Sequence, residues 1–243
     1  GHIGQAAAAG PSDATNAPTR VAVLLRDGNR DGMPDALGQT FLVEGVLSAD
    51  PLMLSSRSRE PTWLINLQDA SGGIVLFVRE AALLPPGLRR GERVRVTGVL
   101  SQYRGAEQLE IKTLEPQGQA PIPDPRAVQA ADLHSEHYSG QLVRVSGELM
   151  TPPDLLRRRS GLRVRDASGE IAVFTAERFF AEAAFANRLL RGGRVEIVGI
   201  ASQDDSDPPF DGGYRLVPRD PDDFRFSLIP PYRTLVVGGG LLA

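Results

Sequence analysis

The amino-acid sequence predicts an all-β protein made of two similar barrels, because one stretch occurs twice among strand-like alternating residues. Residues 67–77, LQDASGGIVLF, return at 164–174 as VRDASGEIAVF. Residues 38–45 and 90–98 have further counterparts at 140–147 and 191–199. Three matches in one order, about 100 residues apart, indicate a duplicated domain rather than a solenoid, whose repeat is about 20–50 residues.

The composition limits the class of protein. The chain has 243 residues, which is enough for two domains that each bury a core. Its formal net charge of −3 supplies no overall attraction to nucleic acid or anionic lipid. Cysteine is absent, which excludes thiol nucleophiles, disulfides and cysteine-based metal sites. The absence of cysteine also suits an oxidising compartment, although small proteins often lack this residue.

Within the first copy, alternation of apolar and polar residues predicts five strands. They cover residues 41–47, 63–68, 74–78, 92–100 and 108–114. The turn from Asp69 to Gly72 closes the second and third strands into a hairpin. Tyr103 to Gly105 connects the fourth strand to the fifth.

In the second copy, the break between the third and fourth strands has the pattern of a helix. Thr175 is expected to cap this helix, and Gly192 with Gly193 to end it. Its apolar side comprises Phe179, Phe180, Phe185, Leu189 and Leu190. Five strands with a helix between the third and fourth are typical of an OB-fold barrel. Gly45 and Gly147 fit as the points where the long first strand bends around the barrel.

The predicted fold class is therefore all-β, with one short helix per repeat at most, as two tandem OB-fold-like five-stranded barrels. Residues 1–18 are predicted to be a disordered lead, and 19–118 the first barrel with an N-terminal Asp-rich loop. Residues 119–130 are predicted to be a semi-rigid proline-rich linker. The second barrel is assigned to 131–227, and a membrane-proximal exit to 228–243.

The exit ends in an apolar run. Residues 234–243 are uncharged and almost wholly apolar, and they have about half the length that a membrane helix needs. Tyr232 and Arg233 before the run suit the membrane–water interface. We expect the start of a transmembrane helix here, and a short terminal strand is the alternative.

Residues 27–35 have the spacing of a calcium-binding loop. Gly32 stands at relative position 6, where a glycine permits a sharp turn. The acidic residue expected at position 12 is missing, because Gly38 stands there. The loop is therefore predicted either to bind calcium or to form an Asx-rich turn that leads into the first strand. The candidate calcium ligands, at positions 1, 3, 5 and 9, are Asp27, Asn29, Asp31 and Asp35. Calcium is the one cofactor considered, and no other is expected.

A second polar cluster holds His134 and His137 beside carboxylates. On a helical turn, two histidines at this spacing could share a metal ion. No third ligand is evident, so an exposed cap or helical turn is the expected structure.

Loops and outward strand positions supply the candidate ligand-binding residues, because OB folds bind ligands on strands two and three and in the adjoining loops. These candidates are Arg157, Arg158, Arg159, Arg163 and Arg165 in the second copy, with Tyr103 and Arg104 in the first. The loop expected opposite the second-copy arginines is acidic and contains Asp204, Asp205, Asp207 and Asp211. Because these charges oppose one another and outward aromatic residues are scarce, we expect a neutralised polar surface and no nucleic-acid partner.

The order of these motifs resembles a known family. The resemblance covers the segment from Pro18 to Val21, the loop at 27–35, the stretches 37–39, 67–74 and 99–105, the second-copy residues 138–143 and the exit at 229–235. It is similar to the extracytoplasmic tandem OB-fold-like sensor region of bacterial membrane sensor histidine kinases, hybrid kinases and related signalling proteins. The matched motifs are mostly structural glycines and turns. In that family the exit leads into a membrane helix and cytoplasmic signalling domains, so the kinase histidine would lie beyond Ala243.

The function expected from the sequence is an extracytoplasmic sensor or interaction module of a membrane-anchored bacterial signal transducer. The expected partners are a small ligand or a protein, the membrane through the C-terminal helix, and a possible second copy in a homodimer. The expected location is the periplasmic or extracellular side of the bacterial inner membrane. No catalytic constellation stands out, so this segment is not expected to be an enzyme. The alternative is a single-stranded nucleic-acid-binding OB module of a secreted or periplasmic protein.

Overall fold

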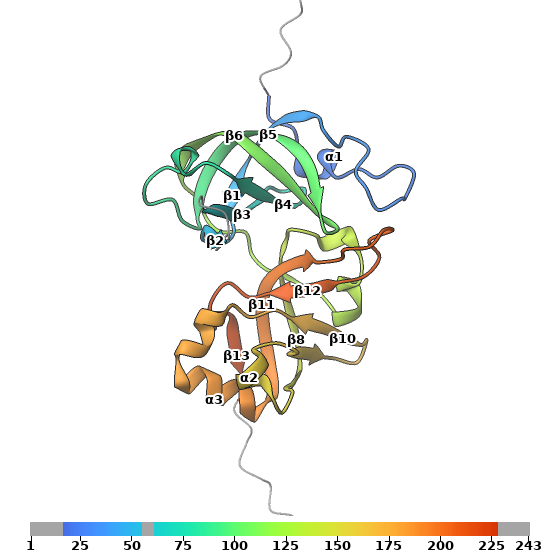
Figure 1. The fold of residues 1–243 in the computed structure, drawn as a ribbon, viewed down its shortest axis with the longest axis vertical. Helices are drawn as coiled ribbons and strands as arrows, with labels where there is room; N and C mark the ends of the chain where they lie inside the picture. The colour runs from blue at the N-terminus through green and yellow to red at the C-terminus, as the bar shows by residue number, and fades with distance from the viewer. Residues whose placement is uncertain (1–16, 55–60, 228–243) are drawn as a thin grey trace, which may run out of the picture.

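The computed structural model describes residues 17–54 and 61–227, which form two closed β-barrels placed one above the other (Figure 1). The predicted lead up to residue 16 and the apolar run from residue 234 lie outside the described residues. Within the described residues, no helix is long and apolar enough to cross a membrane.

The first barrel is formed by six strands. They are β1 (Thr40–Leu47), β2 (Leu52–Leu54), β3 (Thr62–Gln68), β4 (Gly73–Val78), β5 (Glu92–Tyr103) and β6 (Ala106–Gln119). The sheet order is β1-β5-β6-β4-β3-β2, and the pairing of β1 with β3 closes it. β4 and β6 run parallel, and every other pairing in this sheet is antiparallel. This order confirms the predicted OB fold, with β2 as an addition in the loop between its first and second strands.

The second barrel repeats this arrangement. Its strands are β7 (Arg126–Ala127), β8 (Leu142–Met150), β9 (Arg163–Arg165), β10 (Glu170–Val173), β11 (Gly193–Gln203), β12 (Tyr214–Val217) and β13 (Phe224–Phe226). The order is β13-β11-β12-β10-β9-β8-β7, closed by β11 with β8, and β10 with β12 is again parallel. Short helices α2 (Leu155–Arg158) and α3 (Ala183–Arg191) lie outside the sheet. β7 shows that the predicted linker contributes a strand, because it pairs with β8.

The bending glycines have a direct steric reason. A Cβ atom on Gly45 would lie 2.6 Å from the carbonyl oxygen of Gln68, and one on Gly147 would lie 2.2 Å from that of Arg165. In both barrels the first strand therefore lies too close to the second at this position for any side chain.

In each barrel the duplicated Asp-Ala-Ser-Gly turn binds the first residue of a short helix that packs into the barrel core. We call this helix the plug. The Asp69 carboxylate accepts a hydrogen bond from the backbone N–H of Val21, which begins α1 (Val21–Leu24). The Asp166 carboxylate likewise accepts one from Ala130, which begins the 3-10 helix Ala130–Leu133. The first and last residues of both plugs are buried in the barrel cores. Retention of this turn in both copies is therefore explained by the fold.

The predicted helix of the second barrel differs from the structure at its start. It is divided into a 3-10 helix (Glu177–Ala181) and α3. Thr175 is wrong as the cap, because it is a buried residue before Ala176, and neither helix has a side-chain cap. Gly192 and Gly193 do end α3, and both have positive φ. In the first barrel the same break holds only the 3-10 helix Ala81–Leu83.

Candidate ligand-binding faces of the two barrels

The two barrels are held together by close backbone contact. A Cβ atom on Gly73 would lie 2.0 Å from the carbonyl oxygen of Gly140, so both positions require glycine. Next to this contact, the side-chain oxygen of Gln68 accepts a hydrogen bond of 2.9 Å from the backbone N–H of Leu142. Gln68 and Gly73 belong to β3 and β4 of the first barrel, the strands on which OB folds bind ligands. The second barrel therefore covers part of this face in the first.

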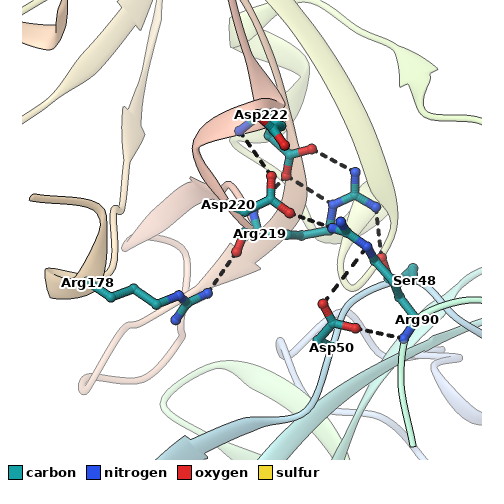
Figure 2. A network of polar contacts seen from close by, with 8 residues as sticks. Ser48, Asp50, Arg90, Arg178, Arg219, Asp220 and Asp222 are labelled. Atoms are coloured by element: carbon teal, nitrogen blue, oxygen red, sulfur yellow. Dashed lines mark hydrogen bonds and ion pairs between the residues drawn. The ribbon is translucent and has the colours of Figure 1, made fainter. Parts of the chain in front are cut away.

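A polar network joins the barrels at the edge of this face (Figure 2). One guanidinium nitrogen of Arg219 donates a 2.9 Å hydrogen bond to the carbonyl oxygen of Ser48 in the first barrel, while its other nitrogens bind Asp223. Arg90 of the first barrel forms a 2.6 Å ion pair with Asp220 of the second. The Arg219–Asp223 ion pair is buried within the second barrel and holds the guanidinium that contacts Ser48. The Arg90–Asp220 ion pair links the two barrels directly and is partly exposed.

A buried carboxyl group lies on the opposite side of the junction. Glu107, at the start of β6, is 6% exposed and accepts a 2.9 Å hydrogen bond from the Ser139 hydroxyl of the second barrel. Burial raises the pKa of Glu107 to about 7, and the hydrogen bonds from its own backbone and from Ser139 offset only part of that effect. The pKa of Glu136 is also raised, by burial and by the charge of Asp27.

The candidate calcium residues form a compact loop beside this carboxyl group. The Asp27 carboxylate accepts hydrogen bonds from the backbone N–H groups of Arg30, Asp31 and Gly32. The Asp31 carboxylate binds the Asn29 amide and the Met33 N–H, and Asp35 binds the N–H of Gly28. These are the contacts of an Asx-rich turn. Among the described residues, no group of three or more acidic or histidine side chains is placed to hold a metal ion, and the calcium site stays a prediction.

This loop also contacts the second barrel. A Cβ atom on Gly32 would lie 2.4 Å from the carbonyl oxygen of Pro209, in the loop between β11 and β12. Gln102 donates a hydrogen bond of 2.7 Å to the carbonyl oxygen of Gly32 from the barrel side. The Asp-rich loop is therefore enclosed between the hairpin tip of one barrel and a loop of the other. A cleft of about 700 Å³, lined among others by Asp27, Arg126 and Tyr214, remains open beside it.

Tyr103 and Arg104 stand at this junction too. Arg104 pairs with Asp204, and its carbonyl oxygen accepts a 2.8 Å hydrogen bond from the N–H of Asp205. Burial alone would raise the pKa of Asp204, but hydrogen bonding to Arg104 and the charges of Arg215 and Arg104 hold it below its ordinary value. Arg104 thus contributes to barrel pairing, while the Tyr103 ring is 66% exposed.

The second-barrel arginines lie on α2, on β9 and in the loop between them. Asp154 pairs with Arg157 and Arg158, and Glu170 with Arg163 and Arg165. Glu177 pairs with Arg159. Five guanidinium groups thus share three carboxylates, which leaves an excess of two positive charges. We call these five arginines, with β9 and β10, the arginine face.

The acidic loop does not neutralise this face. Asp204 faces Arg104 and Arg215, at the junction with the first barrel. The Asp205 carboxylate accepts hydrogen bonds from the loop's own N–H groups at Asp207 and Gly212, and Asp211 lines the cleft. The partial neutralisation of the arginines therefore comes from carboxylates in their own neighbourhood.

An exposed aromatic residue beside the arginine face was missed by the sequence analysis. Phe174 directly follows β10, and 48% of it is exposed. The Arg215 guanidinium lies 4.7 Å from its ring centroid, in a cation–π contact. A signal was present, because Phe174 and Phe77 occupy the same place in the duplicated stretch, and Phe77 carries Arg79 over its ring in the same manner.

His134 and His137 contact the rings of Tyr214 and Tyr138 instead of each other.

Comparison with known proteins gives matches to solved structures. No family model matches the chain, and no curated protein matches it either. The second single-stranded DNA-binding protein from Mycobacterium smegmatis is 16% identical, with a TM-score of 0.30, over 33% of this chain and 90% of that one. The mitochondrial single-stranded DNA-binding protein Rim1 from S. cerevisiae is 14% identical, with a TM-score of 0.30, over 35% and 98%.

The second OB-fold domain of replication protein A from Methanococcus maripaludis is 13% identical, with a TM-score of 0.29, over 35% of this chain and 90% of that one. An asparaginyl-tRNA synthetase from Pyrococcus horikoshii is 15% identical, with a TM-score of 0.33, over 44% of this chain. That match covers 24% of the synthetase. These likenesses concern the OB fold alone.

Proposed function

We propose that the chain is an OB-fold binding module whose arginine face binds single-stranded nucleic acid. This was the alternative in the sequence analysis, and the placement of Phe174 is the observation that most favours it. An exposed ring at the end of the third OB strand gives a base a surface on which to stack. The five arginines beside it give the phosphates positive charge.

The charge balance supports this proposal. Each carboxylate on the arginine face is shared or exposed, and the side chains of Arg157, Arg158 and Arg165 are 76%, 66% and 52% exposed. Exposed ion pairs of this kind contribute about 0–1 kcal/mol each, so a phosphate can replace a carboxylate at small cost. The net charge of −3 for the whole chain does not prevent this, because charges beyond about 8–10 Å are screened at physiological salt.

Fluorescence anisotropy with a labelled oligothymidylate of about 15 nucleotides tests the proposal, because one OB fold covers about 4–16 nucleotides. We expect binding whose log affinity falls with log salt at a slope between about −2 and −4, as for three to five phosphate contacts. Phe174→Ala should weaken binding by about 1–3 kcal/mol. The double variant Arg163→Gln with Arg165→Gln should make the slope less steep, because it removes phosphate contacts. Arg225→Gln, an exposed arginine on β13, is the control. Absence of binding at about 50 mM salt would refute the proposal.

The second candidate function is the extracytoplasmic sensor module of a membrane-anchored signal transducer, without catalytic activity of its own. An open cleft beside the contacts that pair the barrels favours it. A ligand bound in that cleft would shift the pairing of the barrels if it bound one arrangement more tightly than another. The continuation of the coding sequence tests this candidate. About ten further apolar residues followed by arginine-rich sequence would support it, and a polar continuation would contradict it.

A further inference from the structure

A second concave region lies between the barrels, away from the cleft beside the Asp-rich loop. It has a volume of about 510 Å³, within the range of small-molecule sites. The first barrel lines it with the outward side chains of β3 and β4, Leu64, Asn66 and Val75, and with the loop that contains β2. The second barrel lines it with β11, β12 and the segment after β10. We call this region the inter-barrel groove.

Two hydrogen-bond donors in the lining of the groove have no acceptor. The side-chain amide nitrogen of Asn66 and the Nε of Arg215 are both buried and unpaired. A buried donor without an acceptor destabilises a fold by about 1–3 kcal/mol. The two donors come from different barrels, from β3 and β12. Both residues line the groove, where a ligand with two acceptor oxygens can supply the missing partners.

The charge of the lining favours an anion. Asp50 is the one carboxylate among the described residues that line the groove, and it pairs with Arg90 outside the lining. Arg215 shares Asp204 with Arg104, so this pair keeps one positive charge in excess. Arg178 donates a hydrogen bond to the carbonyl oxygen of Arg219 and has no carboxylate within 4.0 Å among the described residues (Figure 2). The groove therefore carries uncompensated positive charge at its second-barrel wall.

The remainder of the lining is apolar. Leu52, Leu54, Leu64 and Val75 of the first barrel face Phe174, Ile200 and Val217 of the second. Such walls disfavour a fully hydrated anion such as free phosphate, because polar groups lose water on entering without gaining hydrogen bonds there. A ligand that fits both observations has an apolar body and one anionic end.

We propose that the inter-barrel groove binds a small amphipathic monocarboxylate. The hydrocarbon or aromatic body lies on Leu64, Val75 and Val217. The carboxylate oxygens accept hydrogen bonds from the Asn66 amide and the Arg215 guanidinium, with Arg178 supplying further positive charge. Phe174 borders both this groove and the arginine face. The proposed polar contacts, Asn66, Arg178 and Arg215, are not among the five arginines of that face, so the proposal does not depend on nucleic-acid binding.

Isothermal titration of the whole chain with octanoate and with 1-octanol tests the proposal, because the two probes share an apolar body and differ in charge. We expect octanoate to bind at least about tenfold more tightly than octanol. Asn66→Leu, which removes the donor at similar size, should weaken octanoate binding about tenfold and leave octanol binding unchanged. Arg178→Met tests the charge at an exposed residue whose replacement leaves the core intact. Arg225→Gln is again the matched control.

The outcomes distinguish the site from general hydrophobic binding. Equal affinity for octanol and octanoate would overturn the proposal. Octanoate affinity that stays at the wild-type value in both Arg178→Met and a folded Asn66→Leu would overturn it too. Thermal unfolding of each variant shows whether it is folded. Oligonucleotide binding by Asn66→Leu should equal that of the wild type, so failure at the groove remains distinguishable from failure at the arginine face.

Discussion

Neutralising Glu107 should stabilise the protein near and above neutral pH. In the unfolded chain this carboxyl group has an ordinary pKa of 4.5, and in the folded protein burial raises the pKa to about 7. The folded protein therefore holds a proton that the unfolded chain has already lost. Stability from this group is fully present below about pH 4.5 and is lost as the pH rises through about 7. At about 1.4 kcal/mol per pH unit, that loss amounts to about 3 kcal/mol.

Glu107→Gln keeps the shape of the side chain and an oxygen that can accept the Ser139 hydrogen bond, but it cannot ionise. Urea unfolding at about pH 5 and about pH 8 should show the variant about 3 kcal/mol more stable than the wild type at the higher pH and similar at the lower. Glu110→Gln, an exposed residue of the same strand, is the control and should keep the wild-type pH dependence. A wild-type decline that persists unchanged in Glu107→Gln would refute the reasoning.

Three further changes test the fold. Asp166→Ala removes a carboxylate that binds the plug at Ala130 and its own turn, and should lower the free energy of unfolding in urea at pH 7 by about 2 kcal/mol. Because hydrogen bonds lower the pKa of Asp166 against the opposing effect of burial, the wild type should lose this stabilisation as the pH falls below about 4. Gly140→Val places a side chain against Gly73, and calorimetry should then resolve two unfolding transitions in place of one. Arg219→Met breaks the network around Ser48 and Asp223 and should lower the free energy of unfolding by about 3 kcal/mol, because it leaves a buried carboxylate unpaired.

The barrel architecture could be predicted because its determinants are local. The duplicated turn, the alternation along the strands and the glycines at 45 and 147 each reflect a steric or hydrogen-bonding need within one barrel. The plugs were harder to predict. Residues 21–24 and 130–133 are single turns, too short for a periodic pattern, and their stability comes from Asp69 and Asp166 across the barrel.

The candidate site was less accessible from sequence, because it depends on how the barrels pair. Arg104 and Asp204 are 100 residues apart and meet only at the junction. Their pairing removes Asp204 from the arginine face, and no local pattern indicates this. Phe174 is exposed because it continues the outward-facing positions of β10, where Ile171 and Val173 point into the core, whereas Phe179 and Phe185 nearby are buried. Aromatic residues of such different exposure look alike in a sequence.

Ultraviolet cross-linking of the chain to oligothymidylate, followed by mass spectrometry of the peptides, tests the central proposal most directly. If bases stack on the arginine face, the cross-linked peptide contains Phe174, and the adduct disappears in Phe174→Ala and at high salt. Tyr103, which is 66% exposed at the hairpin tip of the first barrel, provides an internal comparison. Adducts at Tyr103 that are unaffected by Phe174→Ala, or no adduct at all under low salt, would contradict the assignment of the arginine face as the nucleic-acid site.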